Sequence, residues 1–143
     1  MRFHRWVSFE SVGALALVAA MGCTSTGRML DLDFAVMSGS VDADIHARVQ
    51  IAADGTTAVM RQGDPDEAMV LPAGEMSELR DMIDAADFSS LDDHYDSHAF
   101  VDLYYVTTVR FENGSYTVMS NDSSDAPDAL QKLDGTLTNI ARN

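Results

Sequence analysis

The chain has 143 residues and a formal net charge of −14 at neutral pH, with 23 acidic and 9 basic residues. This length fits a single domain with one hydrophobic core. The acidic excess excludes the basic face that binding to nucleic-acid phosphates requires, so we expect no nucleic-acid partner. It also argues against electrostatic docking to anionic lipid headgroups.

The first 22 residues have the pattern of a secretory signal peptide. Arg2 and Arg5 give a basic start, and an apolar run from Val12 to Met21 follows. The run has roughly 10 residues, whereas a membrane-spanning helix needs about 20. We therefore predict that residues 1–22 are removed from the mature protein.

Cys23 is the only cysteine of the chain, and it directly follows Ala20-Met21-Gly22. This segment resembles the lipobox that ends the signal peptides of bacterial lipoproteins. The resemblance implies that the Cys23 thiol is acylated, that cleavage frees the Cys23 amine, and that this amine then receives a fatty acid such as palmitate. The membrane is then a partner through the lipid anchor. An ordinary secretory signal that leaves Cys23 as a free thiol is the alternative.

The lipoprotein resemblance also predicts a location. It places the protein in the bacterial cell envelope, held at a membrane by lipid. The residue after the cysteine is Thr24 rather than an aspartate, and in Gram-negative lipoproteins this favours the outer membrane.

The sequence therefore divides into three parts. We expect a signal peptide over residues 1–22, the lipidated cysteine with a short tether over 23–29, and a single domain over 30–143. Loss of the signal peptide removes two of the 9 basic and one of the 23 acidic residues, which leaves a net charge of −15. Because Cys23 is the only thiol, no disulfide can form within the chain, and the core alone must stabilise the domain.

The first part of the domain alternates between apolar and polar residues, as strands do. Apolar residues recur at every second position over 30–37 and 45–51, which predicts strands with one buried face. Asp54-Gly55 predicts a tight turn because glycine tolerates positive φ, and residues 56–61 return as the partner strand. Residues 69–71 are expected to add a short edge strand.

Residues 72–86 switch to helical spacing. Apolar side chains at intervals of three and four form one stripe, which consists of Met76, Leu79, Met82, Ile83 and Ala86. Phe88 and Leu91 are expected to fill the core after the helix ends. A polar loop follows over residues 92–99.

The second half repeats the order of hairpin and helix. Residues 101–111 form the longest predicted strand, and Asn113-Gly114 is a strong hairpin signal that leads into residues 115–121. Pro127 then precedes a helix whose apolar stripe contains Leu130, Leu133, Leu137 and Ile140. We therefore predict an α+β domain of order ββα-ββα, an antiparallel sheet with two helices packed on one face. Internal pseudo-symmetry and simple recurrence of a favourable unit are both open as explanations.

The mature domain also carries a family resemblance. It depends on the order of five features: the segment Ala85-Ala86-Asp87-Phe88, the loop to Asp102, the Asn113-Gly114 hairpin, Pro127, and the pair Leu130 and Leu133. This order resembles that of emfourin-like domains. These domains are small bacterial inhibitors of thermolysin-type metalloproteases, and residues 45–141 resemble them. The resemblance implies protease inhibition. The family carries a Gly-Gly-Phe-like segment in its first hairpin, where this chain has Ala53-Asp54-Gly55, so no inhibitory residue is transferred.

The densest polar cluster runs from Asp92 to His98. On an extended segment His94, Asp96 and His98 share one side, and with Asp93 they offer carboxylate and imidazole ligands. These ligand types suit zinc or another divalent ion. The alternative interpretation is a solvated acidic loop.

Catalytic signatures are absent from the sequence. It has no GxSxG nucleophile elbow and no glycine-rich phosphate loop after a strand, so we predict no enzyme, no catalytic residue and no cofactor. The sequence instead favours a lipid-anchored, non-enzymatic module that binds a protein partner, with protease inhibition as its most specific form. The alternative is a periplasmic ligand- or metal-binding lipoprotein that uses loop 92–98.

Overall fold

The computed structural model describes residues 27–39, 44–96 and 102–143. The predicted signal peptide, Cys23 and His98 lie outside these residues. The described chain contains β1 (Met29–Ser38), β2 (Ile45–Ala52), β3 (Thr56–Arg61), β4 (Glu67–Val70), α1 (Ala73–Ala86), the short 3-10 helix η2 (Phe88–Ser90), β5 (Leu103–Phe111), β6 (Gly114–Ser120) and α2 (Asp128–Arg142).

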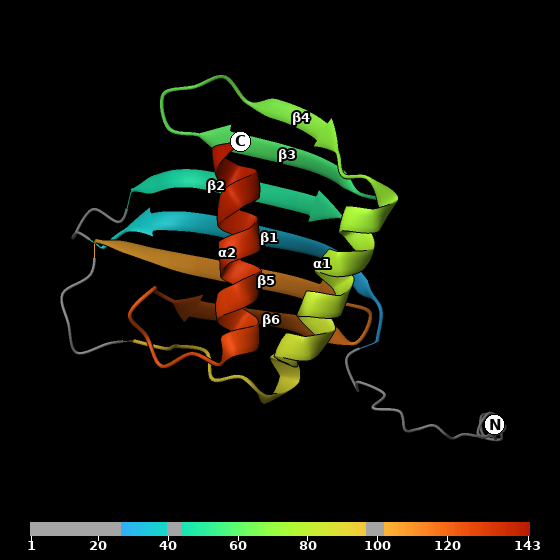
Figure 1. Ribbon diagram of the computed structural model, residues 1–143, viewed down its shortest axis with the longest axis vertical. Coiled ribbons are helices and arrows are strands. Elements are labelled where there is room, and N and C mark those ends of the chain that lie inside the picture. Colours follow the sequence, from blue (N-terminus) through green and yellow to red (C-terminus); the bar gives the residue numbers. More distant parts are fainter. Residues whose placement is uncertain (1–26, 40–43, 97–101) are drawn as a thin grey trace, which may run out of the picture.

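The six strands form one antiparallel sheet, and α1 and α2 both cover the same face of it (Figure 1). The predicted α+β class, the antiparallel sheet and the placement of both helices on one face are confirmed. The strand order is β4-β3-β2-β1-β5-β6. Along the chain the order is ββββα-ββα, because the predicted ββα-ββα order leaves out the strands at 30–37 and 69–71. In the sheet, β1 lies between the two predicted hairpins, and β4 pairs with the outer strand of the first one.

β1 is the central strand that joins the two hairpins. It pairs with β2 on one side and with β5 on the other. Its alternating sequence buries Leu32, Phe34 and Val36 under the helices. Because two large hairpins meet only through β1, the continuity of the sheet depends on this strand.

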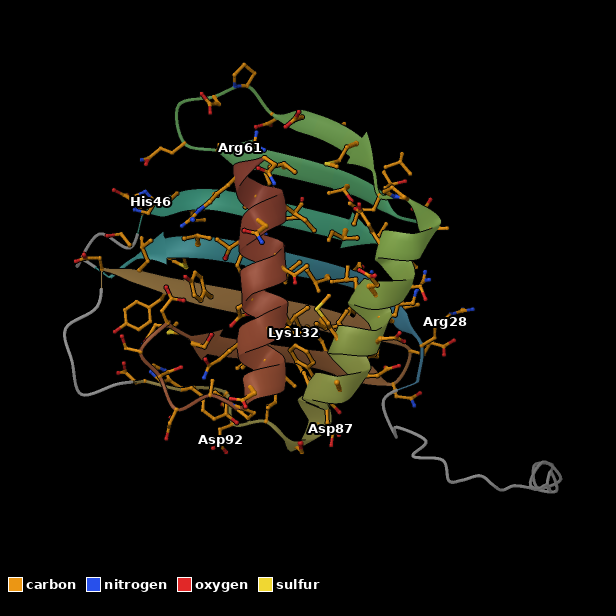
Figure 2. All side chains as sticks on the ribbon, in the orientation of Figure 1. Arg28, His46, Arg61, Asp87, Asp92 and Lys132 are labelled. Atoms are coloured by element: carbon orange, nitrogen blue, oxygen red, sulfur yellow. The ribbon has the colours of Figure 1, made fainter. Side chains whose placement is uncertain are left out.

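The fold begins slightly earlier than the sequence predicts. Met29, expected in the tether, is buried and pairs with Phe111 of β5. The Arg28 backbone N–H donates to Glu112 Oε1, and the Arg28 carbonyl accepts from the Glu112 N–H. The chain is thus attached to the sheet from Arg28 onward, at the start of β1 (Arg28 is labelled in Figure 2).

The predicted apolar stripes are the faces that pack on the sheet. The fully buried members are Met76, Leu79, Ile83 and Ala86 of α1 and Leu130, Leu133 and Leu137 of α2. Phe88 is buried after the helix, as expected. Met82 and Ile140 are only partly buried, and both lie beside the groove described below.

One carboxylate lies in the core. Asp134 of α2 is only 3% exposed, and it accepts hydrogen bonds from the hydroxyls of Thr107 (3.0 Å) and Ser120 (2.6 Å). Burial raises the pKa of Asp134 to about 6, although the two hydroxyl hydrogen bonds oppose the rise; the nearby Asp122 carboxylate adds to it. The apolar periodicity of α2 gives no sign of this buried acid.

Asp134 should make the stability of the fold depend on pH. Its carboxyl has an ordinary pKa of 3.8 and a folded-state pKa of about 6, so between these values the folded state binds more protons than the unfolded state. The contribution of Asp134 to the free energy of unfolding therefore falls as pH rises through this window. In Asp134→Asn the amide can still hydrogen bond with both hydroxyls. We expect the variant to gain about 1–3 kcal/mol at neutral pH and to lose this pH dependence.

Urea denaturation between pH 4 and 7 measures this effect. The exposed Asp125→Asn variant is the matched control and should keep the slope of the parent protein. An Asp134→Asn variant that is less stable at neutral pH, or that keeps the same slope, would contradict the account.

Candidate functional site

β4 is an exposed strand at one edge of the sheet. Within the described chain it pairs with β3 and has no neighbour on its outer side. All four of its residues are exposed, including Met69 at 40% and Val70 at 68%. Exposed apolar edges invite pairing with another chain unless something blocks them. Pro65 and Pro72 flank the strand and keep the accessible edge short.

The backbone of β4 directs two residues away from the sheet. The Leu71 N–H donates to the Gly55 carbonyl across the turn, at 3.0 Å. Successive residues of an antiparallel strand alternate in direction, so Met69 also directs its N–H and C=O toward β3. Ala68 and Val70 therefore direct their N–H and C=O groups outward, where a further strand could bind them.

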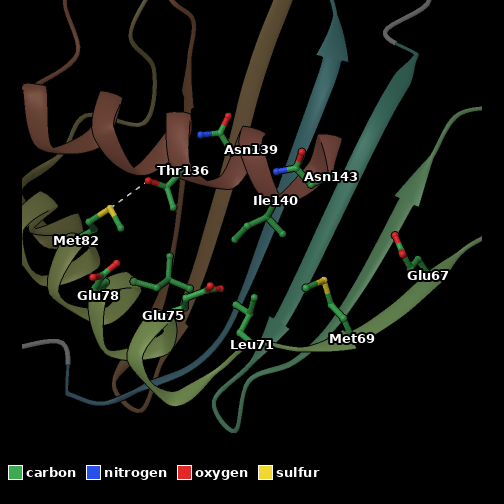
Figure 3. Close-up of a pocket in the computed structure, with 11 residues that line it drawn as sticks. Glu67, Met69, Leu71, Glu75, Glu78, Met82, Thr136, Asn139, Ile140 and Asn143 are labelled. Atoms are coloured by element: carbon green, nitrogen blue, oxygen red, sulfur yellow. Dashed lines mark hydrogen bonds between the residues drawn. The ribbon is translucent and has the colours of Figure 1, made fainter.

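A groove of about 460 Å³ lies beside β4, between α1 and the C-terminal part of α2 (Figure 3). Its apolar surface comes from β4, the β4–α1 connection, α1 and α2, and consists of Met69, Leu71, Leu79, Met82 and Ile140. The Thr136 hydroxyl donates to the Met82 sulfur at 3.5 Å, a contact that links the two helices at one end of the groove. The groove therefore combines an apolar lining with the exposed edge strand.

The rim of the groove is polar and acidic. Glu67, Glu75 and Glu78 contribute carboxylates, and Asn139 and Asn143 contribute amides. Among the described residues Glu75 and Glu78 form no ion pair, so their charges are available to an incoming cation.

Arg61 of β3 fixes the position of the third rim carboxylate. Its Nη1 lies 2.9 Å from Glu67 Oε1, and its Nε donates to the Ala141 carbonyl at 2.5 Å, near the C-terminal end of α2 (Figure 2). A cation at a helix C-terminus also interacts favourably with the helix dipole. Arg61 thereby connects the β4 side of the groove to α2.

The structure places the predicted metal ligands only in part. His94 Nε2 lies 3.6 Å from Asp96 Oδ2, and both side chains are about half exposed. Asp93 contributes its backbone instead, because its carbonyl accepts from the Met119 N–H. His98 lies outside the described residues. Over the described ranges no three His, Cys, Asp or Glu side chains are placed to hold a metal ion, so the complete site stays a prediction.

The same segment has a structural role at the second edge of the sheet. The Tyr95 N–H donates to the Met119 carbonyl at 2.8 Å, which completes a parallel bridge between residues 93–95 and β6. This part of the β6 edge is therefore covered, whereas the β4 edge is open. The sequence suggests only a polar loop here.

The groove itself is not apparent from the sequence. Helical spacing assigns Met82 and Ile140 to the buried stripes, and the edge strand is predicted at 69–71, two residues later than β4 begins. The available signal is the apolar pair Met69-Val70, which lies between two prolines and shortly after Asp64 and Asp66.

Comparison with models of known protein families and with curated proteins finds no match to this chain. No helix in the described part of the chain is long and apolar enough to cross a membrane. The interpretation of the site therefore depends on its own geometry.

Proposed function

We propose that the protein is a lipid-anchored, non-enzymatic module of the bacterial cell envelope that binds a protein partner at the β4 groove. By this name we mean the β4 edge together with the adjoining cavity. The observation that carries the proposal is that an unpaired edge strand and an apolar groove occur side by side. Exposed apolar surface with a polar rim is typical of protein interaction sites.

The lipid anchor would determine how the domain sits. Cys23 precedes Gly27, the first described residue, by four positions, which an extended chain spans in at most about 14 Å. A lipid on Cys23 would thus hold the start of β1 close to the membrane. The β2–β3 and β5–β6 turns lie at this same end of the sheet, because β2 and β5 run antiparallel to β1 and end where β1 begins (Figure 1). The β4 edge then runs along the side of the domain and stays accessible.

The β4 groove is a better candidate for the binding function than loop 92–98. A catalytic or structural zinc site needs three or four protein ligands, and the described part of the loop brings together only His94 and Asp96. The groove offers five apolar side chains and two outward backbone residues. Metal binding by the loop remains the alternative function, and its remaining ligand, His98, lies outside the described residues.

Protease inhibition, which the resemblance to emfourin-like domains implies, is the most specific form of this proposal. An inhibitor must present an exposed segment that a protease can engage, and β4 with the preceding loop is one such segment. Inhibition of thermolysin at sub-micromolar protein would support this form. Its absence would leave the broader binding function.

The anchor is tested by Cys23→Ala. The variant cannot be acylated, so we expect its precursor to stay unprocessed by the globomycin-sensitive peptidase and the lipid-dependent membrane retention to disappear. Fractionation and gel mobility measure both effects, with Thr24→Ala as the matched control. Unchanged processing and lipid labelling of the Cys23→Ala variant would refute the anchor.

The binding surface is tested by site-specific photo-crosslinking in intact cells. A photoreactive residue at Val70 should give a discrete protein adduct, because this side chain is exposed on the β4 edge, where the partner is expected to bind. The same residue at Ser115, an exposed position in β6, is the control and should give none. Equal adducts from both positions, or none from Val70, would contradict the proposal.

A further inference from the structure

We infer that the occupant of the β4 groove is an extended, basic segment of the partner, which adds to the sheet as a seventh strand beside β4. This inference rests on the proposed function, since it presupposes a protein partner. It adds the chemistry of the partner segment and the way in which that segment binds to β4. Addition of a strand to an exposed edge provides affinity through main-chain hydrogen bonds and specificity through pockets for alternate side chains.

The main-chain component comes from the outward groups of Ala68 and Val70. They can exchange hydrogen bonds with an incoming strand without disturbing the Leu71 to Gly55 bond, because that bond points to the other side of β4. The prolines at positions 65 and 72 bound this edge. The occupant therefore pairs over a stretch of about 4–5 residues, the length of a short strand.

The side-chain component comes from Met69. In an antiparallel pairing, the partner residue opposite Met69 occupies a non-hydrogen-bonded position, where Cα atoms lie only about 4.5 Å apart and side chains are close. Met69 lines the groove on the helix side of the sheet, so the opposing side chain points to the same side. The flexible methionine can adapt to an apolar residue placed there.

The charge around the β4 groove selects a basic occupant. Asp64 and Asp66 precede the strand, and Glu75 and Glu78 lie on the rim; all four are exposed, and none forms an ion pair within the described residues. Every second side chain of a strand points to the same face, so a lysine or arginine two residues away from the apolar residue opposite Met69 also lies on the helix side, toward Glu75 and Glu78. A second copy of the chain is disfavoured, because each copy without its predicted signal peptide has a net charge of −15.

The probe is a capped peptide of sequence Thr-Lys-Thr-Val-Thr-Lys-Thr, whose valine and two lysines point to the same side of a strand, compared with its glutamate–valine analogue, in which glutamate replaces each lysine. We expect only the basic peptide to bind, with amide chemical-shift changes in NMR spectra concentrated on β4. A version of the basic peptide N-methylated at alternate residues keeps its charge but loses the strand hydrogen bonds, and it should bind about tenfold more weakly.

Two protein variants separate strand addition from simple charge attraction. Val70→Pro removes one outward N–H and should weaken binding about tenfold, whereas Val70→Thr keeps this N–H and should change it less than about twofold. Proline is tolerated at edge positions whose N–H faces outward, and thermal melting verifies the fold. The double variant Glu75→Gln/Glu78→Gln should weaken binding and reduce its dependence on salt.

The inference is overturned if Val70→Pro and the N-methylated peptide bind as tightly as their controls, because charge alone would then hold the occupant. It is also overturned if the glutamate–valine peptide binds equally well, if no peptide binds, or if the protein forms a dimer through β4. None of these results removes a crosslink from Val70, so failure of the binding mode is distinguishable from failure of the proposed function.

Discussion

The pairing of β1 on both of its edges is the interaction on which the structure depends. Without it the sheet would divide into the three strands β2–β4 and the β5–β6 hairpin, and an isolated two-stranded hairpin is at best marginally stable in water. β1 joins them into a sheet wide enough for two helices to cover. The burial of Leu32, Phe34 and Val36 beneath those helices makes this pairing part of the hydrophobic core. The strand also connects directly to the segment that carries the predicted anchor.

The central position of β1 also explains why the two edges of the sheet differ. On the β6 side, residues 93–95 return from η2 and bridge to Met119, so that edge is partly covered. On the β4 side the chain turns at Pro72 directly into α1, and no described segment returns to cover the strand. The C-terminal end of α2 lies over β3, and all four residues of β4 stay exposed (Figure 1). The exposed edge and the adjoining cavity, which together form the β4 groove, result from this arrangement.

Much of the fold could be predicted because its signals are local. Alternation located β1, Gly55 with φ of 91° occupies the predicted first turn, and the helical stripes identified the buried faces. The candidate site could not be predicted in the same way. Whether Ile140 packs in the core or borders a groove depends on how α1 and α2 meet at the sheet edge, which is a tertiary property. The burial of Asp134 likewise depends on Thr107 and Ser120, which are distant in sequence.

Strand addition at β4 requires its outward backbone groups to hydrogen bond with a partner strand. Hydrogen exchange of individual amides in the full domain measures this directly, in the free protein and with the basic peptide bound. We expect Ala68 and Val70 to exchange rapidly in the free protein, where β3 already protects Met69, and we expect binding to slow Ala68 and Val70 selectively. Equal protection of all three amides before binding, or no slowing of Ala68 and Val70 on binding, would contradict it.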